Sequence, residues 1–353
     1  MSVQMEKNLN RHNWVDVLKF LGIFAIYLGH FGNKSGKLYL FVFSYHVPLF
    51  FFMSGFFALN DRDKGIFEYI IKKLKQLMIP YVCFVIVSVV FYGIMRDLGG
   101  FEILRMTKSY VFGIRNTLVS GGLWFIPCIF VVSNMYFLLY KSFKNKYAIL
   151  ISSVVIFIIS RTLLPKEPSW FMNIDSAMYY ILYYSIGNIS FQCMSNFNFK
   201  KSDLKVKALF IIMVMMSTLV TLITYFKGIS LSVEIVHNLF KFLDFIPLIY
   251  FSYSVFVVLN IIFFNVVLAY MARNIRVFQQ IGRNTLVLCG IENIAKMSIQ
   301  TVVSILGLSI SINNPLACVF YTFICLLIAQ YMISGVLQKY LLLPVMRIKI
   351  CNR

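Results

Sequence analysis

Charged residues are scarce in this chain, and acidic residues are the scarcest. Of its 353 residues, 13% are charged and 60% are hydrophobic, and 13 Asp and Glu stand against 33 Lys and Arg. A soluble domain of this length could not hide that much apolar surface. No internal repeat, low-complexity tract or soluble extramembrane domain is visible. The composition therefore excludes an ordinary soluble protein.

Patterns typical of metal sites and disulfide frameworks are also missing. The seven cysteines include no C-x-x-C pair, and most of them fall within apolar runs. They are expected to be small core residues, and we expect no metal. The chain starts with a polar segment, 1–13, so a cleaved signal peptide is not expected.

Long apolar runs, in contrast, recur from one end of the chain to the other. A helix needs about 20 residues to cross ~30 Å of hydrocarbon. The runs predict an all-α polytopic membrane protein that forms a single membrane-embedded domain over 1–353. The longest connection between spans is 96–122. We expect ten transmembrane helices, over 14–31, 38–59, 77–95, 123–140, 147–164, 177–191, 208–226, 245–270, 286–308 and 315–337.

The positive charge is distributed as in a membrane protein and not as in a nucleic-acid-binding protein. The formal net charge is +20, and with ten spans one set of connections and ends carries 21 Lys and Arg against 10 on the other side. Cytoplasmic segments of membrane proteins carry such an excess. We therefore expect both termini to be cytoplasmic, membrane lipids to be partners, and no nucleic acid to bind.

Two of the four histidines, His30 and His46, lie inside apolar runs joined by a short loop. An ionisable side chain at membrane depth is by default a candidate functional residue. Lys19 and His30 are eleven residues apart, close to three helical turns, so both are predicted to share one helix face, about 16 Å apart along the axis. Asp16 lies one turn before Lys19 and joins this face. The pattern favours a helix that lines a polar cavity.

Plainer interpretations of these residues stay open. Asp16 and Lys19 have the spacing of an i,i+3 ion pair near the membrane interface, with Lys19 extending towards water. His46 lies two residues before Pro48, so it is equally compatible with a kinked packing helix that contains one satisfied histidine. Gly55, further along this run, is expected to allow a close helix contact.

Five short blocks, spread in order over nearly the whole chain, carry a resemblance to a known family. They are WVDVLKFLGIFAIYLGH (14–30), HVPLFFFMSGF (46–56), KKLKQLMIPY (72–81), GLWFIP (122–127) and IGRNTL (281–286). The chain resembles the acyltransferase family 3 integral membrane proteins, which are ten-helix enzymes similar to the O-antigen and capsule O-acetylases. The first two blocks together are the most specific.

The resemblance implies a bacterial cytoplasmic membrane enzyme, a multi-pass O-acetyltransferase that modifies polysaccharide. Acetyl-CoA, or another acyl-CoA, is the implied donor, and a hydroxyl of a cell-surface or lipid-linked sugar is the implied acceptor. The family pattern in the first helix is a basic residue, most often Arg, followed eleven positions later by His. Lys19 and His30 match this spacing, but a lysine lacks the planar fork with which an arginine clamps a phosphate or carboxylate.

Acyl transfer from a thioester requires a base, oxyanion stabilisation and an anion site for CoA. His30 is the candidate base, with Lys19 as its basic partner, because a neutral imidazole can act near pH 7. His46 is the candidate to position the acceptor or to donate to the oxyanion. For the CoA phosphates the candidates are Lys72, Lys73 and Lys75, although each is also explained by ordinary cytoplasmic anchoring.

The candidate acceptor contacts are Asp16, Trp124 and Glu292. Trp124 is either an interfacial aromatic residue or a wall of the acceptor site. Glu292 and Lys296 are four residues apart, in the orientation that favours a helical ion pair. Such a pair is either structural or a means by which Glu292 orients a histidine or contacts the sugar.

Two other classes of function remain open at this point. A transporter or flippase for lipid-linked glycans would also contain many helices and buried charges, although no paired repeat or matching broken helix is visible. A sensor or assembly subunit could use the histidines as a pH switch. The sequence does not specify the acceptor, the acyl group or the oligomeric state.

Overall fold

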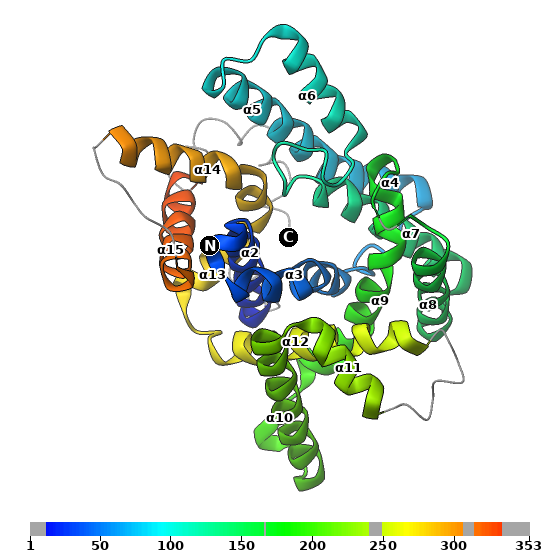
Figure 1. Ribbon diagram of the computed structural model, residues 1–353. Helices are drawn as coiled ribbons and strands as arrows, with labels where there is room; N and C mark the ends of the chain where they lie inside the picture. Colours follow the sequence, from blue (N-terminus) through cyan, green and yellow to red (C-terminus); the bar gives the residue numbers. More distant parts are fainter. Residues whose placement is uncertain (1–11, 166, 240–248, 306–313, 334–353) are drawn as a thin grey trace, which may run out of the picture. The chain divides into compact units, whose positions relative to one another are not determined.

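The computed structural model describes residues 12–165, 167–239, 249–305 and 314–333, and most of these residues are helical, with no strand among them (Figure 1). The prediction of an all-α protein is therefore confirmed. Each of the ten expected spans overlaps a helix, although several predicted ends extend a few residues beyond it. The predicted ends over 245–248, 306–308 and 334–337 lie outside the described residues. These helices are α2 (Asn13–Gly29), α3 (Lys37–Gly55), α5 (Ile79–Met95), α7 (Phe125–Phe143), α8 (Lys146–Thr162), α9 (Ile174–Asn196), α10 (Leu204–Lys227), α12 (Ile249–Met271), α14 (Thr285–Ile305) and α15 (Pro315–Met332).

Seven helical segments among the described residues are long and apolar enough to cross a membrane. They are α3, the continuous segment Ile66–Met95 that contains α5, α7, α10, most of α12, α14 and α15. The protein is thus a polytopic membrane protein. The count of ten spans and the cytoplasmic position of both termini stay predictions.

Short helices occupy several connections that the sequence analysis treated as loops. They are α4 (Ile66–Lys73), α6 (Gly100–Phe112), α11 (Ile229–Leu239) and α13 (Arg276–Arg283), and a π-helical turn, η2 (Leu74–Met78), joins α4 to α5. At the start of α6 the Glu102 carboxylate accepts a hydrogen bond from the Gly99 N–H, and the helix ends at Gly113, whose φ of 64° is left-handed. The connection 96–122 is therefore a structured element.

The described residues form two compact units. The first unit comprises those within Met1–Met53, Ser190–Thr285 and Ser311–Ile324, and the second comprises those within Ser54–Ile189, Leu286–Ile310 and Cys325–Arg353. In the first unit α12 and α13 pack against α2, and α10 packs against α11 and α12. In the second unit α7 packs against α4, η2 and α8, and α5 packs against α6.

The outer surface of α5 is apolar in a way that suits hydrocarbon. Val82, Ile86, Val90 and Ile94 recur every four residues and are all exposed. Residues at this spacing lie on one side of a helix. In α10 only 17% of the apolar window is buried within the protein. These surfaces fit contact with lipid, where exposed aliphatic side chains carry no penalty.

Within the second unit, Gly55 at the end of α3 meets α9 at backbone distance. A Cβ at Gly55 would lie 2.0 Å from the Tyr184 carbonyl oxygen. The Gly55 carbonyl accepts a hydrogen bond from Asn188 Nδ2 at 3.0 Å, and Asn188 Oδ1 accepts one from Tyr136 at 2.8 Å. The predicted close helix contact is confirmed, and it is secured by an interhelical amide of the kind that stabilises membrane helices.

We expect Gly55→Ala to destabilise the protein by about 1–3 kcal/mol, because the added methyl group meets backbone and not a flexible side chain. Thermal unfolding of the detergent-solubilised protein measures the effect. Gly100→Ala is the matched control, since a Cβ there meets no atom within 4 Å. Equal melting temperatures for the two variants would contradict the close contact.

Candidate active site

The first unit carries both candidate histidines. α2 holds Asp16 and Lys19 in its N-terminal half and ends at Gly29, so His30 is the first residue beyond the helix. The His30 backbone N–H still donates to the Ile26 carbonyl, at 3.1 Å. Lys19 is half-buried and His30 is exposed. The helix thus supports the predicted three-turn spacing and leaves the imidazole at its end accessible.

Both imidazoles lie against one aromatic ring, that of Phe43 in α3. Its centroid is 6.4 Å from that of His30 and 4.9 Å from that of His46. Gly29 makes this approach possible, because a Cβ there would meet the Phe43 ring at 2.8 Å. The structure therefore brings the two histidines to one place, as the short connection between their helices predicted.

His46 is buried, and its hydrogen bond defines the tautomer of its ring. Its Nδ1 lies 2.7 Å from the Val42 carbonyl oxygen. A carbonyl oxygen can only accept, so Nδ1 carries the proton. In the neutral ring Nε2 is then the basic nitrogen, as in histidines whose tautomer is set by a carbonyl partner. α3 remains helical through Pro48, and the histidine projects from that helix.

At the other end of α2, Asp16 is buried and paired with a residue far away in sequence. Its Oδ2 accepts from Arg283 Nε at 3.2 Å, across 267 positions of the chain. The aspartate is 3% exposed. A buried carboxylate needs such a partner. Asp16, predicted from the sequence as an acceptor contact, is thus the partner of Arg283, to which no role was assigned.

α13 docks on α2 next to this ion pair. A Cβ at Gly282 would lie 1.8 Å from the Asp16 carbonyl oxygen, so glycine is required for the contact. Phe278 stacks on Phe20 with centroids 4.2 Å apart. Two of the blocks that carry the family resemblance, 14–30 and 281–286, are therefore parts of one packed element.

The second unit contains the predicted ion pair of α14. Lys296 Nζ donates to Glu292 Oε1 at 2.7 Å, and both residues are buried. The pairing predicted from the spacing is confirmed. Its function is left open by this contact alone, because a buried carboxylate needs a cation whether or not it binds substrate.

The segment 122–124, called here the Gly122 segment, carries Trp124 and packs beside Glu292. A Cβ at Gly122 would lie 3.4 Å from the Cys289 carbonyl oxygen and 3.6 Å from Glu292 Oε2. The Cys289 thiol lies 3.6 Å from the Gly122 carbonyl oxygen and donates to it. Trp124 itself is buried, two residues further on. Two of the predicted acceptor residues thus belong to neighbouring segments of one unit.

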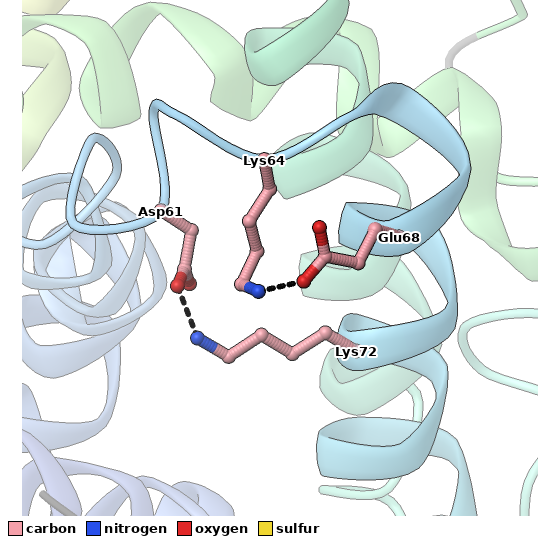
Figure 2. Close-up of polar contacts among 4 residues, drawn as sticks. All are labelled: Asp61, Lys64, Glu68 and Lys72. Carbon is pink, nitrogen blue, oxygen red and sulfur yellow. Dashed lines mark hydrogen bonds and ion pairs between the residues drawn. The ribbon is translucent and has the colours of Figure 1, made fainter.

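The lysines before α5 differ in their surroundings. Lys72 binds the Asp61 carboxylate, and Lys64 binds Glu68 nearby (Figure 2). Lys73 lies over the Tyr69 ring, with Nζ 5.3 Å from the centroid, and Lys75 is exposed. A phosphate would compete with Asp61 for Lys72, whereas Lys75 presents its ammonium group to solvent.

Sequence reasoning assigned no role to the residues that connect α6, α7 and α9. Asn173 is fully buried and makes three hydrogen bonds to two other segments, with Gly113 and Arg115 in one and Trp124 in the other. Arg115 lies over the Trp124 ring at 4.8 Å. The sequence offered one signal, because Arg115 is the single arginine near the end of the connection 96–122. Only the fold shows that it contacts Trp124.

Removing Arg283 should destabilise the first unit. We expect Arg283→Met to lower the free energy of unfolding by about 1–3 kcal/mol, less than the 3–5 kcal/mol typical of fully buried pairs, because Arg283 is partly hydrated. Adding Asp16→Asn should restore part of the loss by removing the uncompensated charge. Arg276→Met, on the exposed side of α13, is the control. Similar unfolding curves for the two single variants would refute the structural role of the pair.

The α14 pair allows a test that separates stability from function. Lys296→Met alone should destabilise the protein by about 3–5 kcal/mol, since it removes the cation that faces the buried Glu292 carboxylate. The double variant Glu292→Leu with Lys296→Met should regain stability. If Glu292 contacts the acceptor, the stable double variant will show a raised KM for it. Full activity would instead give the pair a purely structural role.

The family to which these elements belong follows from a match over almost the whole chain. A family model for an acyltransferase domain matches residues 12–333, from the start of α2 to the end of α15. No curated protein and no solved structure matches the sequence. The match favours acyl transfer over the alternative of a glycan transporter or flippase. The protein therefore belongs to acyltransferase family 3 and is a polytopic membrane enzyme that transfers acyl groups other than amino-acyl groups.

Proposed function

We propose that the protein is an O-acyltransferase, and specifically an O-acetyltransferase, of the bacterial cytoplasmic membrane. It takes the acyl group from cytoplasmic acyl-CoA and transfers it to a hydroxyl of a cell-surface or lipid-linked sugar. The observation that carries this proposal, beyond the family, is the pair of histidines beside Phe43. One of them is exposed and the other is buried with its tautomer defined.

In the proposed reaction His30 is the general base. It accepts the proton of the sugar hydroxyl while the hydroxyl oxygen attacks the thioester carbonyl carbon. The C–O bond forms, the C–S bond of the tetrahedral intermediate breaks, and the thiolate takes the proton from the imidazolium to give free CoA. The position of His30 at the C-terminal end of α2 supports this role, because the carbonyl groups at a helix end stabilise a cation.

His46 is the proposed positioning partner. With Nδ1–H donated to the Val42 carbonyl, neutral His46 offers only the Nε2 lone pair, which can hold the acceptor hydroxyl. If Nε2 is protonated as well, the same nitrogen can donate to the oxyanion. In either state the Val42 bond fixes the direction in which Nε2 points.

For the donor, we propose that Lys73 and Lys75 bind the phosphates of CoA as point charges, together with Lys72 when it releases Asp61. Lys19 supplies a positive charge on the helix that carries His30. Trp124 and Glu292 are the proposed acceptor contacts. Asp16 contributes by holding α13 against α2 through Arg283.

Release of free CoA from acetyl-CoA tests the proposal. In membrane vesicles that contain the glycan, we expect His30→Ala to lower the rate by about 10²–10⁴-fold, as for loss of a general base. His46→Asn keeps a donor for Val42 but lacks Nε2, and a loss of about 10²-fold is expected if Nε2 contacts the oxyanion. His237→Asn, in α11, is the control. Normal turnover by the His30 variant would overturn the assignment.

A further inference from the structure

Arg115 differs in its surroundings from three other partly or fully buried cations of the second unit. Lys72, Lys64 and Lys296 are each paired with a carboxylate. Arg115 is half-buried, yet among the described residues no carboxylate lies within ion-pair distance of it. A guanidinium carries five donors and is ordinarily satisfied when it is withdrawn from water.

An aromatic ring and a hydroxyl hold this guanidinium in place. Its Cζ lies 4.8 Å from the centroid of the Trp124 ring, and Nη1 donates to the Tyr180 hydroxyl at 3.4 Å. Trp124 and Tyr180 are both buried. Arg96, Arg161 and Arg273 also stack on rings, but they are exposed. Arg115 is therefore oriented by a rigid platform and retains donors that no protein carboxylate uses.

The backbone around Arg115 is fixed from two sides. The Arg115 N–H donates to Asn173 Oδ1 at 2.6 Å, and Asn173 Nδ2 donates to the carbonyl groups of Gly113 and Trp124. On the preceding helix, Tyr110 accepts a hydrogen bond from the Ser120 N–H. Burial raises the pKa of Tyr110 to about 12, so its hydroxyl stays neutral. The guanidinium is thus held before any ligand arrives.

The backbone close to Arg115 and Asn173 adopts unfavourable dihedral angles at three residues. Asn116, Met172 and Asn173 have φ of 68°, 52° and 56°, in the left-handed region that non-glycine residues rarely adopt. Strain of this kind persists where the surroundings impose it, and it concentrates at binding and catalytic sites. The nearby carboxylate of Asp175 is used elsewhere, since it accepts from the backbone N–H groups of Ser169, Trp170 and Ser176.

We propose that Arg115, carried on Trp124 and Tyr180, is an anion-binding residue of the acceptor site that recognises a carboxylate or phosphate group of the glycan. A planar guanidinium matches both groups through paired N–H donors. Since one face of Trp124 is covered by Arg115, the tryptophan acts chiefly by positioning the arginine. This inference rests on the proposed function in taking a glycan as the acceptor, and it specifies that the glycan is acidic.

Binding of four small probes to the purified full-length protein, in detergent and without acyl-CoA, tests the proposal. Methyl glucuronide carries a carboxylate, glucose 1-phosphate carries a phosphate, methyl glucoside is neutral, and glycerophosphoglycerol represents a lipid headgroup. We expect one of the two acidic sugars to bind about tenfold or more tightly than methyl glucoside, as a charge-assisted contact implies. Which acidic sugar binds distinguishes a sugar acid from a sugar phosphate.

Variants of the protein test whether Arg115 causes the preference for acidic sugars. Arg115→Gln should abolish it, Arg115→Lys should retain part of it, and Arg161→Gln, an exposed arginine over Tyr179, should leave it unchanged. Melting temperatures confirm that each variant is folded. The proposal is overturned if Arg115→Gln keeps the preference, if no probe binds, or if glycerophosphoglycerol binds as well as the acidic sugars. CoA release from acetyl-CoA by the same variants, measured in membrane vesicles that contain the glycan, separates failure of this site from failure of acyl transfer.

Discussion

A polar group in hydrocarbon must find its partner within the protein, and this constraint accounts for three buried contacts of this enzyme. Asp16 meets it through Arg283, Glu292 through Lys296, and His46 through the Val42 carbonyl. Each partnership also has a geometric consequence. The first docks α13 on α2, the second leaves one carboxylate oxygen of Glu292 towards the Gly122 segment, and the third fixes the tautomer of a candidate active-site histidine.

Glycines allow these partnerships by letting backbone and rings come close. Gly282 brings α13 to the backbone of Asp16, Gly29 admits the Phe43 ring beside His30, and Gly55 brings α3 to α9. In each case a methyl group would occupy the space of an atom already present. Small residues at helix contacts are how membrane proteins pack without a strong hydrophobic drive between helices.

The long helices and the α14 ion pair could be predicted from the sequence, because hydropathy and the i,i+4 spacing are local properties. The short helices α4, α6, α11 and α13 were missed, since their residues are too few or too polar to be recognised as spans. The pairing of Asp16 with Arg283, and of Arg115 with Trp124, also lay beyond sequence reasoning. These contacts join segments that only the fold brings together, and no periodicity along the chain reports them.

The central claim is that this membrane acyltransferase modifies a sugar hydroxyl by a reaction that depends on His30. The most direct measurement is mass spectrometry of the surface and lipid-linked glycans from cells that lack the gene and carry either the wild-type or the His30→Ala copy. The account predicts that one acyl increment, which alkaline hydrolysis removes as expected for an ester, is present only with the wild-type copy. Identical glycan masses in both strains would contradict it.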